Sequence, residues 1–225
     1  MQPSASRDAR PALLEGMDGL ARQRLLAACR PRRFRSREIV FHEGDPGESV
    51  HIVMSGRVAV RVTTPLGHVV TLSVLGPGDS FGELALLDPD SLRTATVIAI
   101  EETHTLMITG TQLAELRRSH LHIDRFLDEM LGGYVRRLSQ MVVEALYLPV
   151  EVRIARRLAN LATVYATTGG RAVIRLTQED LASMAGTTRA TTNKVLQELA
   201  SRNVLRLGRG RIEVRDRAAL ARAGG

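Results

Sequence analysis

The amino-acid sequence predicts an α+β protein with three successive parts: an antiparallel β-roll, one long helix, and a small basic domain of helices and a β-hairpin. In the first half, short apolar blocks rich in β-branched residues alternate with glycine-containing turns. Apolar residues then recur at steps of three and four, and positive charge concentrates in the last third. The 225 residues allow one large domain or two small ones, and we expect boundaries at 1–120, 121–148 and 149–225.

The composition excludes several classes of protein. Hydrophobic residues make up 44% and charged residues 24% of the chain, as is typical of a protein that buries cores. A single cysteine, Cys29, excludes a disulfide framework, a cysteine-rich zinc site and a protein-held iron–sulfur cluster. The first residues lack the pattern of a secretory signal, and no run of about 18 apolar residues occurs, so we expect a cytoplasmic protein with no membrane partner.

Apolar blocks between Arg37 and Ile108 have the length and composition of β-strands. Turns rich in Gly, Pro, Asp and Ser separate them, which predicts a compact antiparallel barrel or roll. A helix is expected before them at about 18–29, followed by a polar basic run at 30–37. The expected strands are 39–41, 50–54, 58–62, 69–75, 95–100 and 104–108.

An apolar stripe predicts a long helix from about Leu121 to Leu148, which Pro149 ends. At 1.5 Å per residue this helix would be about 42 Å long, more than a small domain needs to cover its core. A two-stranded coiled coil would bury the rest of the stripe, which predicts a homodimer; burial wholly within one chain is the alternative. Gly132 and Gly133 each cost on the order of 1 kcal/mol, so packing must hold this helix. The stripe comprises Ile123, Leu127, Met130, Tyr134, Leu138, Met141 and Ala145.

The excess positive charge lies entirely in the last third of the chain. Residues 1–148 carry 17 basic and 18 acidic side chains, whereas residues 149–225 carry 14 basic and 6 acidic ones, a net charge of +8. This balance is typical of a domain that binds a polyanion, because each neutralised phosphate releases counterions. A generic solvated surface is the alternative.

Two short helices joined by a glycine-containing turn are predicted in this basic domain, which is the layout of a helix-turn-helix. Thr177 is a good N-cap for the first of them, and Thr188 caps the second. The expected elements are a helix at 152–166, a helix from Thr177 to Gly186, a helix at 189–202, and a hairpin at 203–214 with the tip Gly208–Arg211.

In such a motif the outward N-terminal face of the second helix reads base edges in the major groove of DNA. Arg189 would contact the N7 and O6 atoms of guanine, and Lys194 a base or a phosphate. Arginines at the hairpin tip would form a basic wing beside this helix. A solvated surface position is the alternative for each residue taken singly. The candidate DNA contacts are Thr188, Arg189, Thr191, Thr192, Asn193, Lys194, Arg209 and Arg211.

A second motif, Phe81-Gly82-Glu83-Leu84-Ala85, is followed after a polar loop by Leu92-Arg93-Thr94. Gly82 permits a close backbone approach, and N–H groups at the start of a short helix from Glu83 attract an anion. The planar guanidinium of Arg93 suits phosphate, and Glu83 would accept hydrogen bonds from a sugar hydroxyl. A glycine turn with a salt bridge between Glu83 and Arg93 is the alternative.

Together these features resemble the Crp/Fnr family of bacterial transcription regulators, and the resemblance covers roughly Asp18 to Val214. It implies a jelly roll like that of cyclic-nucleotide-binding domains, a dimer helix, and a winged helix-turn-helix that binds a palindromic DNA site and works with RNA polymerase. It implies cAMP as the effector, with another cyclic nucleotide or none as alternatives. The residues it implies for effector binding are Gly82, Glu83, Leu84, Arg93, Thr94 and Ser139.

Two positions depart from the family pattern. Members that bind cyclic AMP hold the purine with a Thr-Ser pair on the dimer helix, and the family spacing places Leu138-Ser139 there, so only the serine is present. Many members carry a glutamate beside the recognition arginine, where this chain has Ala190. Because a methyl group cannot accept from cytosine N4, the preferred half-site should differ at that base pair.

The leading hypothesis is therefore an effector-gated, homodimeric DNA-binding regulator that is not an enzyme. The closest alternative is a regulator of the same build that uses another ligand or none, and a further one is a cyclic-nucleotide module that acts on another protein. A cupin-like enzyme would need clustered metal ligands, which the scattered histidines do not supply, so we expect no metal site. Surface or turn positions are expected for His42, His51, His68, His104, His120 and His122.

Overall fold

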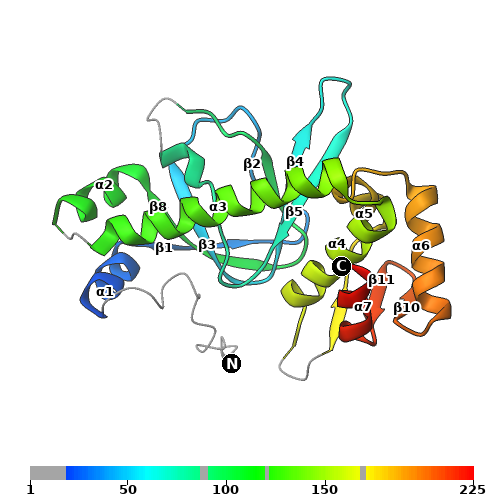
Figure 1. Cartoon of the computed structure of the whole chain (residues 1–225). Helices are drawn as coiled ribbons and strands as arrows, with labels where there is room; N and C mark the ends of the chain where they lie inside the picture. Colours follow the sequence, from blue (N-terminus) through cyan, green and yellow to red (C-terminus); the bar gives the residue numbers. More distant parts are fainter. Residues whose placement is uncertain (1–18, 87–90, 120–121, 168–170) are drawn as a thin grey trace. The chain divides into compact units, whose positions relative to one another are not determined.

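The computed structural model describes residues 19–86, 91–119, 122–167 and 171–225 (Figure 1). The chain divides into two compact units, one formed by residues 1–62 and 75–136 and the other by residues 63–74 and 137–225. The predicted start of the first helix at Asp18, the start of the long helix at Leu121, and His120 lie outside the described residues.

Two antiparallel sheets form the predicted β-roll, with strand orders β1-β8-β3-β6 and β2-β7-β4-β5. Strands form because side chains alternate between a buried and an outer face; in β8, Thr103 and Thr105 are buried and His104 is exposed. The six predicted strands are confirmed to within one residue at each end. The strands are β1 Arg30–Phe34, β2 Ile39–Phe41, β3 Ser49–Ser55, β4 Val58–Thr63, β5 Val69–Leu75, β6 Ser80–Phe81, β7 Thr96–Ala99 and β8 Thr103–Thr109.

Helices pack against strands of the first unit through one apolar cluster. These helices are α1 Gly19–Ala28, α2 Gly110–Ser119 and the first part of α3, which spans His122–Tyr147. Each of them contributes buried side chains, so the helices and the inner strands share a core. The cluster comprises Ala21, Leu25, Val50, Ile52, Ile108, Leu113, Leu127 and Met130.

Three elements of the first unit have no counterpart in the sequence prediction: β1, the two-residue strand β6, and α2. β1 has the sequence RPRRF, and four of its five residues are exposed, so it shows no apolar alternation. It is nevertheless paired along its whole length with β8, from Arg30 opposite Met107 to Phe34 opposite Thr103. α2 is short, with Leu113 buried in the core cluster and Leu116 packed against it. The strand conformation of β1 thus comes from its pairing with β8 rather than from its own pattern.

The second unit contains the predicted helix-turn-helix and wing. A three-stranded antiparallel sheet of order β10-β11-β9 supports the helices. The wing hairpin is confirmed, and β9 and α7 are additions that the sequence prediction lacked. Its elements are α4 Val150–Val164, β9 Ala172–Ile174, α5 Gln178–Met184, α6 Arg189–Ser201, β10 Leu205–Gly208, β11 Arg211–Val214 and α7 Arg217–Ala223. Its fully buried side chains include Ile154, Leu158, Ile174, Leu181, Leu196 and Leu220.

The apolar stripe of α3 is divided between two environments. Leu127 and Met130 are buried in the core of the first unit. From Val135 onward all large apolar side chains of the helix except Met141 are exposed. Met141, which the sequence placed on the stripe, is half-buried. The exposed side chains, 47–76% accessible, are Val135, Leu138, Val142, Val143, Leu146 and Tyr147.

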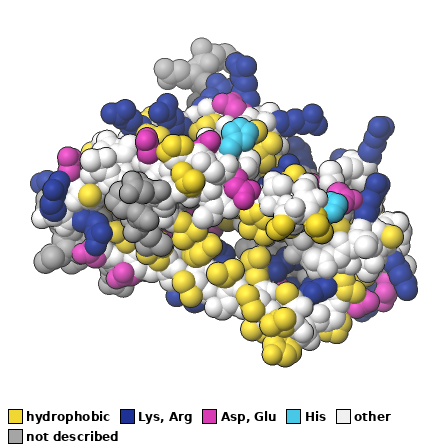
Figure 2. Space-filling view, turned by 90° about the horizontal axis from the view of Figure 1, so that it is seen from above, with side chains coloured by type: hydrophobic (Ala, Val, Ile, Leu, Met, Phe, Trp, Pro, Cys, Tyr) yellow, Lys and Arg dark blue, Asp and Glu magenta, His cyan; other side chains and the backbone are white. Residues whose placement is uncertain are grey.

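The surface carries both apolar and basic groups. Figure 2 shows exposed hydrophobic side chains gathered on part of the face in view. Lys and Arg side chains project mainly at the outer edge of this face. None of the helices in the described ranges is long and apolar enough to cross a membrane.

Candidate anion pocket and nucleic-acid interface

Gly82 lies where the backbone passes close to Arg93. It follows β6 with a φ of +85°, a conformation that favours glycine. A Cβ atom at this position would lie 2.7 Å from Nη1 of Arg93 and 2.8 Å from the carbonyl oxygen of Ser49. The short helix predicted after Gly82 is confirmed as the 3-10 helix η2, Glu83–Leu86.

Arg93 is a buried cation held by protein oxygens, and it is only 6% exposed. Its Nη1 donates to the carbonyl oxygens of Ser49 at 2.8 Å and Gly82 at 3.2 Å, and Nη2 donates to Ser49 Oγ at 3.0 Å. The guanidinium lies over the ring of Phe41, with Cζ 4.0 Å from the ring centroid. This arrangement fixes a charged, planar group at a defined place in the roll.

Burial and nearby charges act on the pKa of Arg93 in opposite directions. Burial lowers the pKa of its guanidinium, and the carboxylates of Asp45, Glu48 and Glu83 raise it. Because arginine stays protonated at physiological pH, its guanidinium supplies a fixed positive charge at this place in the roll, with carboxylates nearby.

The structure brings together three of the six predicted effector-binding residues. Gly82, Glu83 and Arg93 lie at one place, and Glu83 is also buried. Beside them, Leu84 is half-buried and Thr94 is exposed. Ser139 belongs to the part of α3 in the second unit, where it is exposed.

His51 contradicts the expectation of a surface or turn position, because it lies on the inner face of β3 and is 4% exposed. Its ring stacks on Phe81 with centroids 5.0 Å apart, and Nδ1 lies 3.0 Å from Thr105 Oγ1. Burial, and then the charges of Arg93 and Arg32, lower the pKa of His51 to about 4. Four consecutive residues of β3, from Val50 to Val53, are buried, so the strand offers no alternation from which the position of His51 could have been predicted.

Metal ligation finds no support in the part of the chain that the structure describes. There, no group of three or more His, Cys, Asp or Glu side chains could hold a metal ion. The side chains of His120 and His122 lie outside the described set.

In the second unit, side-chain caps fix the start of both helices of the helix-turn-helix. The predicted cap Thr177 forms a full capping box with Asp180 at α5. The predicted cap Thr188 accepts from the N–H of Thr191 at 3.2 Å at the start of α6. These bonds hold the backbone that carries the candidate DNA contacts.

The outward face of α6 presents polar side chains to solvent. Arg189, Asn193 and Lys194 are exposed, and so is Ala190. Thr192, predicted as a DNA contact, is fully buried. Thr192 lies one helical turn before Val195 and Leu196, on the face of α6 that packs into the core. The prediction that it contacts DNA is therefore wrong.

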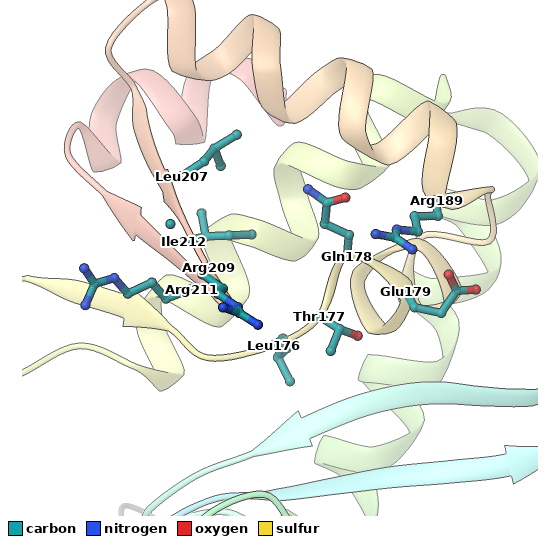
Figure 3. A pocket seen from close by; sticks show the side chains of 11 residues that line it. Leu176, Thr177, Gln178, Glu179, Arg189, Leu207, Arg209, Arg211 and Ile212 are labelled. Carbon is teal, nitrogen blue, oxygen red and sulfur yellow. The ribbon is translucent and has the colours of Figure 1, made fainter.

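The wing and the two helix starts enclose a groove of about 610 Å³. Arg189, Arg209 and Arg211 line it, against one acidic side chain, Glu179 (Figure 3). Gln178, which the sequence analysis did not single out, reaches into the same groove from the first turn of α5. Its position as the first residue of α5 is the sequence feature that could have marked Gln178 as a candidate.

A network inside the second unit joins the end of α3 to the helix-turn-helix. Glu144 of α3 is 6% exposed. Its Oε2 lies 2.7 Å from Nη2 of Arg157, and its Oε1 lies 3.7 Å from Nη1 of Arg156. Nε of Arg157 in turn donates to the carbonyl oxygen of Met184 in α5 at 3.1 Å. The helix that leaves the roll is thus tied to the first helix of the motif.

Residues 31–120 match the model of the cyclic nucleotide-binding domain, and residues 152–223 match that of the Crp-like helix-turn-helix domain. The chain is 31% identical over 217 residues to the CRP-like cAMP-activated global transcriptional regulator of Mycobacterium tuberculosis, covering 95% of this chain and 96% of that protein. It is 36% identical over 182 residues to the cyclic AMP receptor protein of Thermus thermophilus, covering 80% and 82%. The solved structure of FixK2 from Bradyrhizobium japonicum shares the fold, with a TM-score of 0.75 at 22% identity over 88% of this chain and 98% of that one.

We expect His51→Gln to reduce the acid sensitivity of folding. Since the folded pKa of His51 is lowered to about 4 from 6.5, the unfolded chain binds a proton in this window that the folded chain does not. The stability contributed by the neutral ring is present above pH 6.5 and is lost as the pH falls toward 4, at about 1.4 kcal/mol per pH unit. Urea unfolding at about pH 4.5, 5.5 and 7 checks this.

The exposed His42→Gln is the matched control and should keep the wild-type dependence on pH. An unchanged dependence in the His51→Gln variant would contradict the assignment.

Proposed function

The chain belongs to the Crp/Fnr family of transcription regulators, and we propose that it acts as a homodimer that binds a palindromic DNA site under the control of a cyclic nucleotide. The family is one of regulators, not of enzymes. The observation that carries the proposal is the buried Arg93 beside Gly82, in the same chain as a capped helix-turn-helix with an exposed basic face.

In the proposed complex the cyclic phosphate binds at Arg93 and Thr94. The segment Gly82–Leu84 supplies backbone N–H groups for the phosphate, and Glu83 accepts a hydrogen bond from a ribose hydroxyl. cAMP is the first candidate because relatives that align along most of the chain are named as cAMP-activated or as cyclic AMP receptors.

In this proposal Ser139 holds the purine, and Leu138 stands where cAMP-binding members carry a threonine. One hydroxyl partner for the base is therefore missing. Selection of adenine over guanine should be weaker than a Thr-Ser pair would give.

A regulator that answers to another ligand, or to none, remains the second candidate. It is favoured by the hydrogen bonds that Arg93 already makes to Ser49 and Gly82, since a phosphate must compete with these oxygens. Leu138 favours the same reading.

The homodimer is supported by the exposed apolar face of α3. Val135, Leu138, Val142 and Leu146 are separated by steps of three and four and are 47–69% exposed. A second copy of the same helix would bury them in a two-stranded seam.

The proposed DNA contacts are Arg189, Asn193 and Lys194 for the bases, and Thr188 and Thr191 for phosphates. Arg209 and Arg211 of the wing are proposed to contact the flanking backbone. A regulator of this kind acts on the chromosome, so we place it in the cytoplasm, with RNA polymerase as a further partner.

Effector and DNA binding are coupled in this proposal by a shift between two arrangements. The effector must bind the DNA-competent arrangement more tightly than the other one. α3 is the proposed carrier, because it begins beside the roll and its Glu144 contacts the first helix of the DNA-binding domain.

We expect isothermal titration of cAMP into the wild-type dimer to give tight binding, which Arg93→Ala weakens by about 100-fold or more because charge-assisted hydrogen bonds are lost. Exposed Arg35→Ala is the matched control and should bind normally. Circular dichroism checks that the Arg93 variant folds. No heat with cAMP or cGMP would favour the second candidate, and effector-responsive DNA binding that survives in Arg93→Ala would refute the proposed gating.

We expect Val142→Asp combined with Leu146→Asp to convert the dimer to a monomer, because each carboxylate would have to be desolvated in the seam. Sedimentation velocity measures the change. Gln140→Asp, an exposed polar position on the same helix, should leave the dimer intact. A wild type that sediments as a monomer would contradict the proposed dimer seam.

We expect the wild type to discriminate weakly between bases at the base pair that position 190 reads. Ala190→Glu should increase the preference for cytosine there by about 1–3 kcal/mol, because a carboxylate accepts a hydrogen bond from cytosine N4. Selection from a randomised half-site followed by sequencing gives the preference. Ala218→Glu adds the same charge on α7 and should not change it. Full discrimination by the wild type at this position would show the expectation to be wrong.

A further inference from the structure

An amide–amide hydrogen bond joins the two helices of the helix-turn-helix on their outer side. Nε2 of Gln178, the first residue of α5, donates to Oδ1 of Asn193 in α6 at 3.3 Å. Asn193 is exposed, and Gln178 is half-buried at the edge of the groove that Arg189 also lines. Figure 3 shows Gln178 and Arg189 reaching into this groove.

The backbone that carries Gln178 is held in place. Thr177 and Asp180 form the capping box around it, with Thr177 Oγ1 donating to Asp180 Oδ2 at 2.7 Å and Asp180 N–H donating to Thr177 Oγ1 at 3.0 Å. Gln178 therefore starts from a defined position, and its amide reaches Asn193 from a fixed base.

The bond changes what Asn193 offers to DNA. An asparagine amide has one carbonyl acceptor and two N–H donors. With both kinds of group available it matches adenine, which presents the N6 donor and the N7 acceptor in the major groove. The bond from Gln178 takes one of the two lone pairs of Oδ1 and turns this oxygen toward α5. The Nδ2 donors are then the groups best placed for a base, and they match guanine, which presents two acceptors, O6 and N7.

We propose that Gln178 is a positioning residue that sets the base preference of Asn193, biasing it toward guanine and away from adenine. The inference rests on the proposed DNA-binding function. Arg189, one helical turn earlier on the same face, also suits guanine, so the two side chains would read neighbouring base pairs of one half-site.

The test is a binding selection from randomised half-sites, run with saturating cAMP and again without nucleotide. The base pair read by Asn193 is identified as the one whose preference Asn193→Ala removes. The wild type should prefer guanine over adenine there by about tenfold. Gln178→Met, which keeps the length of the side chain and removes its donor, should bring this ratio close to one.

Two further variants separate positioning from a general loss of structure or affinity. Gln178→Lys restores a donor to Asn193 Oδ1 and should restore the guanine preference, whatever its effect on total affinity. In the Asn193→Ala background, Gln178→Met should change no base preference, because its target is absent. Gln197→Met, an exposed glutamine of α6, is the matched control and should behave as the wild type.

The outcomes are distinguishable. A wild type that selects no duplex in either condition defeats the proposed function and this inference with it. A wild type that selects a half-site, with Gln178→Met giving the same guanine-to-adenine ratio, defeats only the inference. A change of preference by Gln178→Met that persists in the Asn193→Ala background also defeats it, since Gln178 would then act on the base directly.

Discussion

The buried charge of Arg93 is the constraint on which the roll depends. Taking a guanidinium out of water costs several kcal/mol unless hydrogen bonds and opposite charges compensate. Here the compensation comes from two carbonyl oxygens, one hydroxyl, an aromatic face and nearby carboxylates. Gly82 makes the close approach possible because it lacks a Cβ atom that would collide with Nη1. An anion that takes over one of these bonds must therefore loosen contacts to β2, β3 and the turn after β6, which couples binding to the sheet itself.

The lowered pKa of His51 has burial of its ring as the largest cause and the charge of Arg93 as the next one. A second cation beside Arg93 would be unfavourable, and burial of the ring acts in the same direction. The ring of His51 stacks on Phe81, which directly precedes Gly82 in the chain. The His51 ring therefore adds no further positive charge beside Arg93 at neutral pH.

Sequence periodicity could predict the elements whose own residues alternate or form a stripe. The six predicted strands of the roll, the long helix and both helices of the motif belong to this group, and residue type predicted the caps Thr177 and Thr188. It could not predict β1, whose arginines are exposed and whose strand conformation comes from pairing with β8. Nor could it place His51, Thr192 or the Gln178–Asn193 bond, because each depends on which face of an element meets another. Gly82, Glu83 and Arg93 could be grouped from the chemistry of their motif, and the family resemblance added Leu84, Thr94 and Ser139, but the oxygens that hold Arg93 could not be predicted.

The carboxylate of Asp180 shows how a small change could reach the DNA-binding face. Its Oδ2 closes the capping box of α5, and its Oδ1 accepts from the hydroxyl of Thr71 on β5 at 3.0 Å. The N–H of Thr71 donates to Ser183 Oγ at 3.1 Å, so this strand holds α5 at two points within the second unit. A hydrogen bond to a charged acceptor contributes about 1.5–3 kcal/mol, and allosteric coupling energies are typically about 1–3 kcal/mol. The two energies are of the same size. Because the capping box uses the other oxygen of Asp180, the bond to Thr71 and the cap of α5 do not compete for the same acceptor atom.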